Sequence, residues 1–290
     1  MMLGSAGGLR IGIESTPTAF RAAAVRYGQA VAAVEVHITD AAGPRGEAAR
    51  RAFAALERQG VNAFDACIAV APMAGMTNSV LELPPRSSGA PLEELAAAEM
   101  TRGLGGDGLE LALFPIRSRD NGPTEYFVTA VQRDAVLGLV SDVAAAGGEI
   151  IAVDAPVTAL ARAASSANCL VASVEYDAIA FHAVQGGTPI LSRAAPVAGG
   201  RVTSDMLIAE IDRCAGYLAT YRADTAIEEL LLVGRTELVP DAARAIAIEF
   251  DVKVRQWKMP GSFQRASESC AIFAGAFGAA TWGVKAGAAA

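Results

Sequence analysis

Near its N-terminus the chain has a stretch, RIGIESTPTAFRAAAV (residues 10–25), that places acid and hydroxyl groups between two apolar runs. The pattern predicts a strand, a polar turn and a second strand, and a turn of this composition could hold a phosphate. Cradling a phosphate requires backbone N–H groups at close range, which glycine permits. Here Thr16 lies in the turn, and Pro17 removes one N–H group and stiffens the chain. The stretch therefore predicts an impaired phosphate hairpin.

Other chemical motifs in the sequence give weaker signals. Residues 103–108 match G-x-G-x-x-G, but the dinucleotide fingerprint needs a strand before it and a helix after it. Here a predicted helix precedes and a predicted strand follows, so we interpret the match as a glycine-rich turn. The sequence contains no G-K-[ST], H-E-x-x-H or G-x-S-x-G motif and no paired His/Cys spacing. It therefore predicts no metal site and no ordinary hydrolytic mechanism.

Composition limits the class of protein and the class of partner. The chain has 290 residues, of which 52% are hydrophobic and 19% charged, as expected for a globular protein of one large or two modest domains. Its formal charge of −7 argues against nucleic acid as a main partner, because phosphate binding needs a concentrated basic surface. The cysteines are far apart, and we interpret them as reduced core residues. A disulfide framework or zinc site is the less favoured alternative.

Neither end of the sequence predicts a membrane segment. The first residues contain no apolar run of signal-peptide length. Residues 269–284 are uncharged, but they fall short of the roughly 20 residues needed to span a bilayer. We expect this run to be a buried, closely packed helix. We expect a soluble protein with no direct membrane span, which could still dock on a component of a membrane.

Apolar, β-branched runs predict one plan that occurs twice. In each half a three-strand meander is followed by a helix and a strand. In the first half we expect strands at 10–14, 19–26, 30–37 and 64–70 and a helix at 44–59. In the second we expect strands at 169–174, 178–184, 189–195, 229–233 and 252–256 and helices at 203–222 and 240–250. Between the halves we expect helices at 92–102, 133–146 and 156–164 and strands at 109–114, 126–131 and 149–153.

A duplicated meander with helices is similar to the actin/Hsp70/sugar-kinase architecture, in which a nucleotide lies between the hairpins of two facing halves. More narrowly, the chain resembles PilM, the cytosolic actin-like component of type IV pilus machines, and its type II secretion relative GspL. The first hairpin of this family reads roughly G-I-D-I-G-S-S-S-I-K-A-V. Glu14 is one methylene longer than the family's Asp and would crowd a water on Mg²⁺. The matched positions are Gly12, Glu14 for the acid, Thr16 for the second glycine, Thr18 for a hydroxyl and Arg21 for the basic residue.

The second hairpin of the family, roughly L-V-D-I-G, departs further. We align it with residues 170–174, so that Ala172 replaces the acid and Val174 replaces the glycine. In this alignment Ala172 can neither hold a metal-bound water nor act as a base. Glu175 and Asp177 follow directly, outside the matched positions.

Further stretches keep the resemblance along the chain. The segment Ser192-Arg193 with Gly199-Gly200 resembles "s-R…G-G" after the third strand. Residues 210–217 resemble a helix signature E-I-x-R-S-x-x-Y. Residues 231–234 resemble the adenosine-contacting turn L-V-G-G, with Arg235 in place of the second glycine. The predicted helix begins soon after Gly200, which leaves little room for a subdomain that PilM inserts there and is closer to the GspL type.

The resemblance implies an α/β, actin-like fold of two lobes. Residues 1–165 would form lobe I with a small inserted subdomain at about 72–118, residues 166–264 lobe II, and residues 265–290 a closing helix that returns to lobe I. The resemblance also implies ATP with Mg²⁺ as the cofactor, although the substitutions predict that hydrolysis is lost. The implied nucleotide-binding residues are Gly12, Glu14, Thr16, Thr18, Arg21, Gly199, Gly200 and Gly234.

The function implied by the resemblance is that of a cytosolic scaffold in a type IV pilus or type II secretion-like inner-membrane assembly. The expected partner is a PilN-like cytosolic peptide on the first lobe, near residues 80–83, with an assembly ATPase as a neighbour. Self-association is left open. Two alternatives differ in class: an active ATPase or phosphotransferase, in which Glu175 or Asp177 supplies the missing acid, and a nucleotide sensor without turnover.

Overall fold

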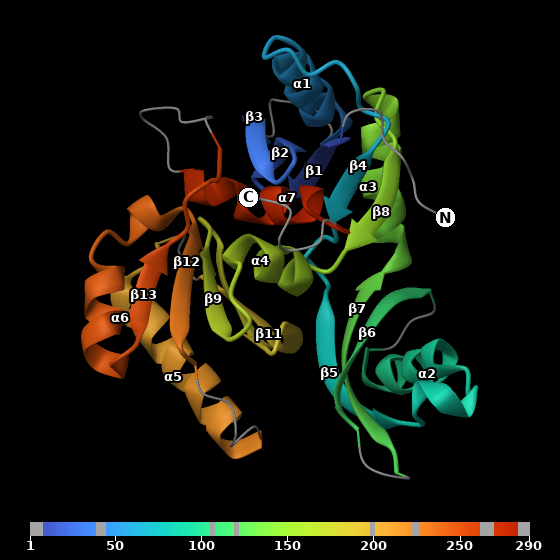
Figure 1. Ribbon diagram of the computed structural model, residues 1–290, viewed down its shortest axis with the longest axis vertical. Helices are drawn as coiled ribbons and strands as arrows, with labels where there is room; N and C mark the ends of the chain where they lie inside the picture. Colours follow the sequence, from blue (N-terminus) through green and yellow to red (C-terminus); the bar gives the residue numbers. More distant parts are fainter. Residues whose placement is uncertain are drawn as a thin grey trace.

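The computed structural model describes residues 8–38, 45–104, 108–118, 122–197, 201–221, 227–261 and 270–283. In these residues two five-stranded sheets lie on either side of a central pair of helices, and a three-stranded sheet lies at the lower right of the view (Figure 1). The two larger sheets have equivalent strand orders, each with an antiparallel meander extended by two parallel strands. The duplicated α/β plan predicted from the sequence is therefore confirmed.

The first sheet has the order β3-β2-β1-β4-β8. Helices α1 (Arg45–Glu57) and α3 (Arg133–Ala145) cover its outer face. Strand β2 is buried along its whole length except at Arg26, as expected for a strand covered on both faces. The strands are β1 (Leu9–Ser15), β2 (Ala19–Arg26), β3 (Gln29–His37), β4 (Cys67–Val70) and β8 (Ile150–Asp154).

The second sheet repeats this arrangement with the order β11-β10-β9-β12-β13. Its outer face is covered by α5 (Ser204–Tyr221) and α6 (Ala242–Phe250). Below, lobe I means the first sheet with its helices, together with the small sheet that follows β4 in the chain, and lobe II means the second sheet with its helices. The strands are β9 (Cys169–Val174), β10 (Ala178–Gln185), β11 (Thr188–Pro196), β12 (Glu229–Gly234) and β13 (Lys253–Gln256).

Helices α4 (Pro156–Ala164) and α7 (Ala274–Ala280) lie between the two sheets (Figure 1). A Cβ on Gly278 would lie 1.8 Å from the carbonyl oxygen of Ala159, so glycine is what allows the two helices to approach. The single helix expected at 269–284 is wrong in detail. In the described residues a 3₁₀ turn (Cys270–Phe273) leads into α7, which ends at Ala280.

The small sheet, with order β5-β7-β6, follows β4 in the chain. Helix α2 (Leu92–Leu104) covers one face, and the sheet contacts β11 of lobe II, where Asn78 Nδ2 donates a hydrogen bond to the Ser192 carbonyl oxygen at 3.1 Å. Residues 80–83, expected near a partner surface, belong to β5. Leu83 is buried under α2 and Val80 packs on the central core. The strands are β5 (Thr77–Leu83), β6 (Leu109–Ser118) and β7 (Thr124–Gln132).

Several predicted boundaries differ from the structure by one to four residues, and one strand was missed. The strand expected at 64–70 begins only at Cys67, and strand β5 was not predicted because it begins with the polar residues Thr77, Asn78 and Ser79. Among the described residues, no helix combines the length and apolar character needed to cross a membrane. The division of the chain at about residues 165 and 264 stays a prediction.

Candidate functional site

The two hairpins that would face a nucleotide are joined by an ion pair. Arg21 of β2 donates two hydrogen bonds to the carboxylate of Glu175, in the turn between β9 and β10, from Nη1 to Oε1 and from Nη2 to Oε2, each at 2.7 Å. A bidentate arginine–carboxylate pair is among the strongest hydrogen-bonded contacts in proteins. The Arg21 side chain is 1% exposed, so this pair connects the two lobes in the interior of the molecule.

Three further charged residues complete the group around Arg21. Its Nε donates to Glu35 Oε1 at 3.0 Å, and its Nη1 approaches Glu14 Oε2 at 3.4 Å. Arg235, which follows β12, donates from Nη2 to the same Glu35 oxygen at 2.5 Å. We call Glu14, Arg21, Glu35, Glu175 and Arg235 the interlobe cluster. Within it, each arginine pairs with a glutamate of the other lobe.

Gly234 brings Arg235 to the cluster. Its φ is +79°, and a Cβ there would lie 2.3 Å from the Val174 carbonyl oxygen, so the backbone can approach β9 only without a side chain. The Arg235 N–H donates to that same carbonyl oxygen at 2.7 Å. Its guanidinium carbon lies 4.4 Å from the centre of the Tyr176 ring, a cation–π contact. The turn expected to contact adenosine therefore positions a cation of the interlobe cluster.

Burial and neighbouring charges shift the protonation of the interlobe cluster in different directions. Burial raises the pKa of Glu14 to about 7, with Arg21 opposing the shift and the Glu175 and Glu35 carboxylates adding to it. Burial also acts to raise the pKa of Glu35, but the Arg21 and Arg235 guanidiniums outweigh it, and that pKa is lowered. Burial disfavours the charge on Arg21, yet the carboxylates around it raise its pKa. Glu14 is thus the carboxyl group in this cluster that takes up a proton near neutral pH.

Gly12, the first predicted phosphate residue, contacts helix α7. A Cβ on Gly12 would lie 1.6 Å from the Ala276 carbonyl oxygen, and one on Gly275 would lie 2.5 Å from Glu14 Oε1. Both glycines therefore let β1 and the Glu14 carboxyl pack tightly against α7. The structure gives the glycine at position 12 a packing role that the sequence reading did not foresee.

The β1–β2 turn uses its own backbone amides. Thr16 Oγ1 accepts hydrogen bonds from the N–H groups of Thr18 at 3.3 Å and Ala19 at 3.0 Å. The Thr16 N–H donates to the Ala19 carbonyl oxygen at 2.8 Å. A phosphate cradle needs such N–H groups to point outward and unpaired. Here the Thr16 hydroxyl has taken two of them.

The two faces of strand β9 pack into different cores. Leu170, Ala172 and Val174 pack together in the core of lobe II under α5 and α6, whereas Val171 belongs to the central core between the lobes. Because side chains alternate along a strand, Ser173 and Glu175 follow Val171 on the inner face. Ala172, which our alignment puts at the acid position, therefore faces the core of lobe II, whereas Ser173 and Glu175 lie on the side of the strand that faces the other lobe.

The structure brings four of the predicted site residues to the interlobe cluster and places two more in the turn beside it. Gly12, Glu14, Arg21 and Gly234 form or support the cluster, and Thr16 and Thr18 lie in the adjoining turn. Gly199 and Gly200 lie outside the described residues. That any of these residues binds a nucleotide stays a prediction. Sequence reasoning missed Glu35. It considered Glu175 only as a substitute acid in the enzyme alternative, and it noted Arg235 only as a departure from the family pattern.

The interlobe cluster does not fit ATP with Mg²⁺. The Glu175 carboxylate lies between the hairpins, where phosphate oxygens would meet it with like charge, and both arginines are already paired with carboxylates. Among the described residues there is no group of three or more His, Cys, Asp or Glu side chains arranged to hold a metal. The arrangement can hold two lobes together and exchange a proton at Glu14, and we derive no phosphoryl transfer from it.

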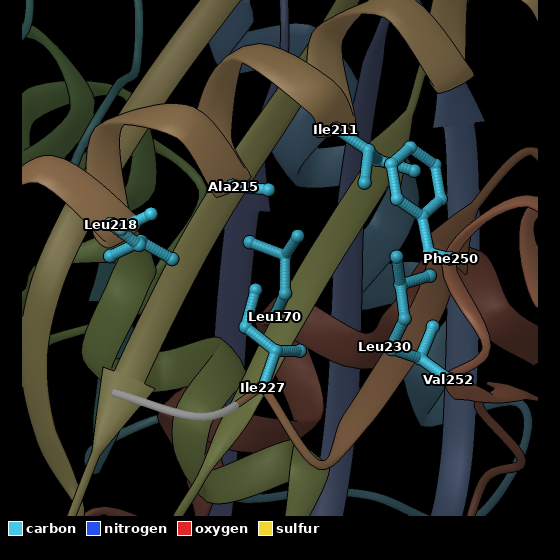
Figure 2. Close-up of a pocket in the computed structure, with 9 residues that line it drawn as sticks. Leu170, Ile211, Ala215, Leu218, Ile227, Leu230, Phe250 and Val252 are labelled. Atoms are coloured by element: carbon cyan, nitrogen blue, oxygen red, sulfur yellow. The ribbon is translucent and has the colours of Figure 1, made fainter. Parts of the chain in front are cut away.

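A separate cavity of about 330 Å³ lies in lobe II between α5, the end of α6 and strands β9 and β12. Figure 2 shows the side chains of Leu170, Ile211, Leu230 and Phe250 converging on it, with Ala215 above. All of its lining residues are apolar. The pocket is partly open to solvent, since Ala219 on its lining is exposed, and its side chains offer no group that could orient a phosphate.

Two sheets of equivalent topology, joined through paired helices with their hairpins facing, define the actin-like ATPase fold. Searches against protein-family models and curated protein sequences find no match. Among solved structures, the chain is similar to the PilM–PilN type IV pilus biogenesis complex, with 16% identity, a TM-score of 0.68 and coverage of 96% of this chain and 99% of that one.

Two other structures show the same fold. The cytoplasmic domain of EpsL, an inner-membrane component of the type II secretion system of Vibrio cholerae, has 11% identity and a TM-score of 0.55, with 94% of each chain covered. The ethanolamine utilization protein EutJ from Carboxydothermus hydrogenoformans has 13% identity and a TM-score of 0.57, covering 97% of this chain and 91% of that one. At these identities the likeness establishes the fold. The actin-like fold predicted from the sequence is thereby confirmed.

Proposed function

We propose that this protein is an actin-like scaffold of a type IV pilus or type II secretion-like assembly, and that it has lost ATP turnover. The likeness of the whole chain to PilM in complex with PilN, and to the cytoplasmic domain of EpsL, supports the assembly role. The observation that carries the loss of turnover is the Arg21–Glu175 pair, which places a carboxylate between the two hairpins.

The proposed partner is a short cytosolic segment of a PilN-like inner-membrane protein, bound on lobe I. An assembly ATPase would be a neighbour in the same machine. The protein would then act in the cytoplasm and reach the inner membrane through these contacts. In this proposal, lobes I and II and the closing helix serve as a rigid frame that presents the partner surface.

The nucleotide part of the proposal is tested by calorimetric titration of the full chain with MgATP, together with a phosphate-release assay. We expect neither heat of binding nor turnover. Binding without turnover would favour the nucleotide sensor instead. Turnover that disappears in Glu14→Gln would establish an active enzyme and overturn the proposal.

The partner part is tested with synthetic peptides. These would correspond to the cytosolic segments of single-span membrane proteins from the pilus and secretion loci of the same genome. We expect one peptide to bind the full chain at a stoichiometry of one, and its scrambled version not to bind. If no such peptide binds and no membrane protein of this kind co-purifies, the scaffold role is wrong.

A further inference from the structure

We propose that the interlobe cluster is a lock that keeps the two lobes closed without a nucleotide, with the Glu175 carboxylate as a built-in occupant of the space between the hairpins. The inference concerns the conformation of this chain and does not depend on which partner binds it. It rests on three observations. Each arginine of the cluster pairs with a glutamate of the other lobe, these side chains are buried, and a second contact joins the lobes elsewhere.

The pairs in the cluster are crossed between the lobes. Arg21 of lobe I holds Glu175 of lobe II through two hydrogen bonds of 2.7 Å. Arg235 of lobe II holds Glu35 of lobe I at 2.5 Å. The Glu35 carboxylate also accepts from Arg21 at 3.0 Å, so the two crossed pairs share one carboxylate. Any separation of the hairpins breaks both crossed pairs together.

The burial of these groups makes their pairing obligatory. The side chains of Arg21 and Arg235 are 1% and 7% exposed, and those of Glu35 and Glu175 are 12% and 13% exposed. A buried ion pair adds little net stability compared with apolar packing, but loss of one partner leaves an uncompensated charge and is strongly unfavourable. The cluster therefore selects one relative placement of the lobes more than it stabilises the fold of either lobe.

A second contact joins the two lobes at a place distant from the hairpins. Asn78 of β5 donates to the backbone of Ser192 in β11 at 3.1 Å. Ile116 of β6 packs against both the central core and the core of lobe II. With the lobes joined at both places, any surface formed by the two lobes is preformed, so a partner would not have to supply the free energy of ordering it.

The experiment measures lobe opening by hydrogen exchange and small-angle X-ray scattering of the full chain. Its variants are Glu175→Gln, which keeps the volume of the side chain, and Glu175→Ala. We expect amide exchange in residues 14–21 and 172–178 to rise about tenfold or more, because the buried Arg21 keeps Glu14 and Glu35 but loses the carboxylate that joins it to lobe II. We also expect the radius of gyration to increase. Exchange in helix α1 and strand β7 should stay as in the parent protein.

The matched control is Glu110→Gln, which breaks the exposed Glu110–Arg133 pair, whose Nε–Oε1 distance is 2.7 Å. We expect no change in exchange at either hairpin. If the Glu175 variants keep hairpin exchange within twofold of the parent, the lock does not exist. If exchange rises equally throughout the chain, or the variants do not fold, the cluster serves folding as a whole and the proposal is equally wrong. Peptide binding can fail in the separate partner test while these results still support the lock.

Discussion

Gly12 of β1 and Ala276 of α7 are packed so closely that a Cβ on Gly12 would lie 1.6 Å from the Ala276 carbonyl oxygen. Gly12→Ala should therefore push the closing helix away and lower the free energy of unfolding by about 3 kcal/mol, at the upper end of overpacking effects. Urea denaturation measures this change. A glycine kept only for phosphate would be replaceable without such a loss.

The control for Gly12→Ala is Gly138→Ala in helix α3. An added Cβ on Gly138 meets nothing within 4 Å, and alanine is the better helix former by up to about 1 kcal/mol. We expect this variant to be as stable as the parent or slightly more stable. Equal urea midpoints for Gly12→Ala and the parent would contradict the packing role.

Glu14 should make the protein more stable as the pH falls through neutrality. Its pKa of about 7 in the folded protein lies above the ordinary value of 4.5, so between these values the folded state binds a proton that the unfolded state does not. By linkage, the free energy of unfolding gains up to about 3 kcal/mol from this group between pH 8 and pH 4.5. Urea unfolding of Glu14→Gln across this range should lack that gain. A pH profile identical to that of the parent would show that Glu14 is not the titrating group.

The groups around Glu14 set the window of this test. Arg21, Glu35, Glu175 and Arg235 face it in the cluster, and His37 lies 3.7 Å from Glu35. The pKa of Glu35 is lowered, so its contribution is lost only below pH 4.5. The gain in unfolding free energy from Glu14 should therefore be measured above pH 4.5.

His182 should make the protein less stable as the pH falls, which is the opposite of the effect of Glu14. It is fully buried in β10, its Nδ1 lies 2.9 Å from Ser192 Oγ, and burial lowers its pKa to about 4. The unfolded state takes up a proton near the ordinary value of 6.5, so stability present above pH 6.5 is lost progressively towards pH 4, by about 3 kcal/mol. His182→Gln keeps a group that can bond Ser192 and should remove this acid loss in urea unfolding. If the acid loss persists in the variant, another group causes it.

The cavity in lobe II offers a gain in stability. Ala215 of α5 lines this pocket of about 330 Å³ (Figure 2). The pocket is partly open, so leucine at this position would cover apolar side chains that solvent now reaches. Ala215→Leu should raise the free energy of unfolding by about 1 kcal/mol, as other cavity-filling changes do. Thermal unfolding measures it, with Ala98→Leu on the exposed face of α2 as the control. A lower melting temperature for Ala215→Leu alone would show that the cavity cannot accept the side chain.

The sequence predicted the fold better than the site. The helices and strands follow from local patterns, whereas the site depends on pairs of residues far apart in the chain. Strands β2, β9 and helix α4 were predicted at their observed bounds, since their apolar patterns and Pro156 at the helix start are local signals. Strand β5 was missed because its first residues are polar, and small residues in α7 gave no sign of where that helix ends.

The site depended on long-range pairing, which no local pattern contains. Arg21 and Glu175 are 154 residues apart and Arg235 and Glu35 are 200 apart, so neither pair could be read from spacing. Our alignment placed Ala172 at the acid position, but its side chain faces the core of lobe II. A shift of one residue moves a side chain to the opposite face of a strand, and burial on both faces of β9 hid which face was inner.

Replacement of Arg21 should destabilise the protein by an amount that depends on pH. Arg21→Ala leaves Glu14, Glu35 and Glu175 close together with Arg235 as the remaining cation of the cluster, and removing one partner of a buried charge group destabilises by about 3–5 kcal/mol. The Arg21 guanidinium opposes the rise in the pKa of Glu14, so without it this carboxyl should take up a proton more readily in the folded state, and the deficit at pH 7.5 should shrink as the pH falls to 5.5. Urea unfolding of the parent and variant at both pH values measures the difference.

The control for Arg21→Ala is Arg133→Ala, which removes the cation of the exposed pair with Glu110. Exposed pairs contribute only about 0–1 kcal/mol, so this variant should differ little from the parent at either pH. A third variant, Arg21→Met, restores the apolar volume of the side chain without its charge. If the charge is what matters, Met at position 21 should be nearly as unstable as Ala at pH 7.5 and should recover in the same way at pH 5.5. If Arg21→Met is as stable as the parent, or if the loss of stability does not change with pH, then Arg21 serves packing and does not act by neutralising the carboxylates of the two lobes.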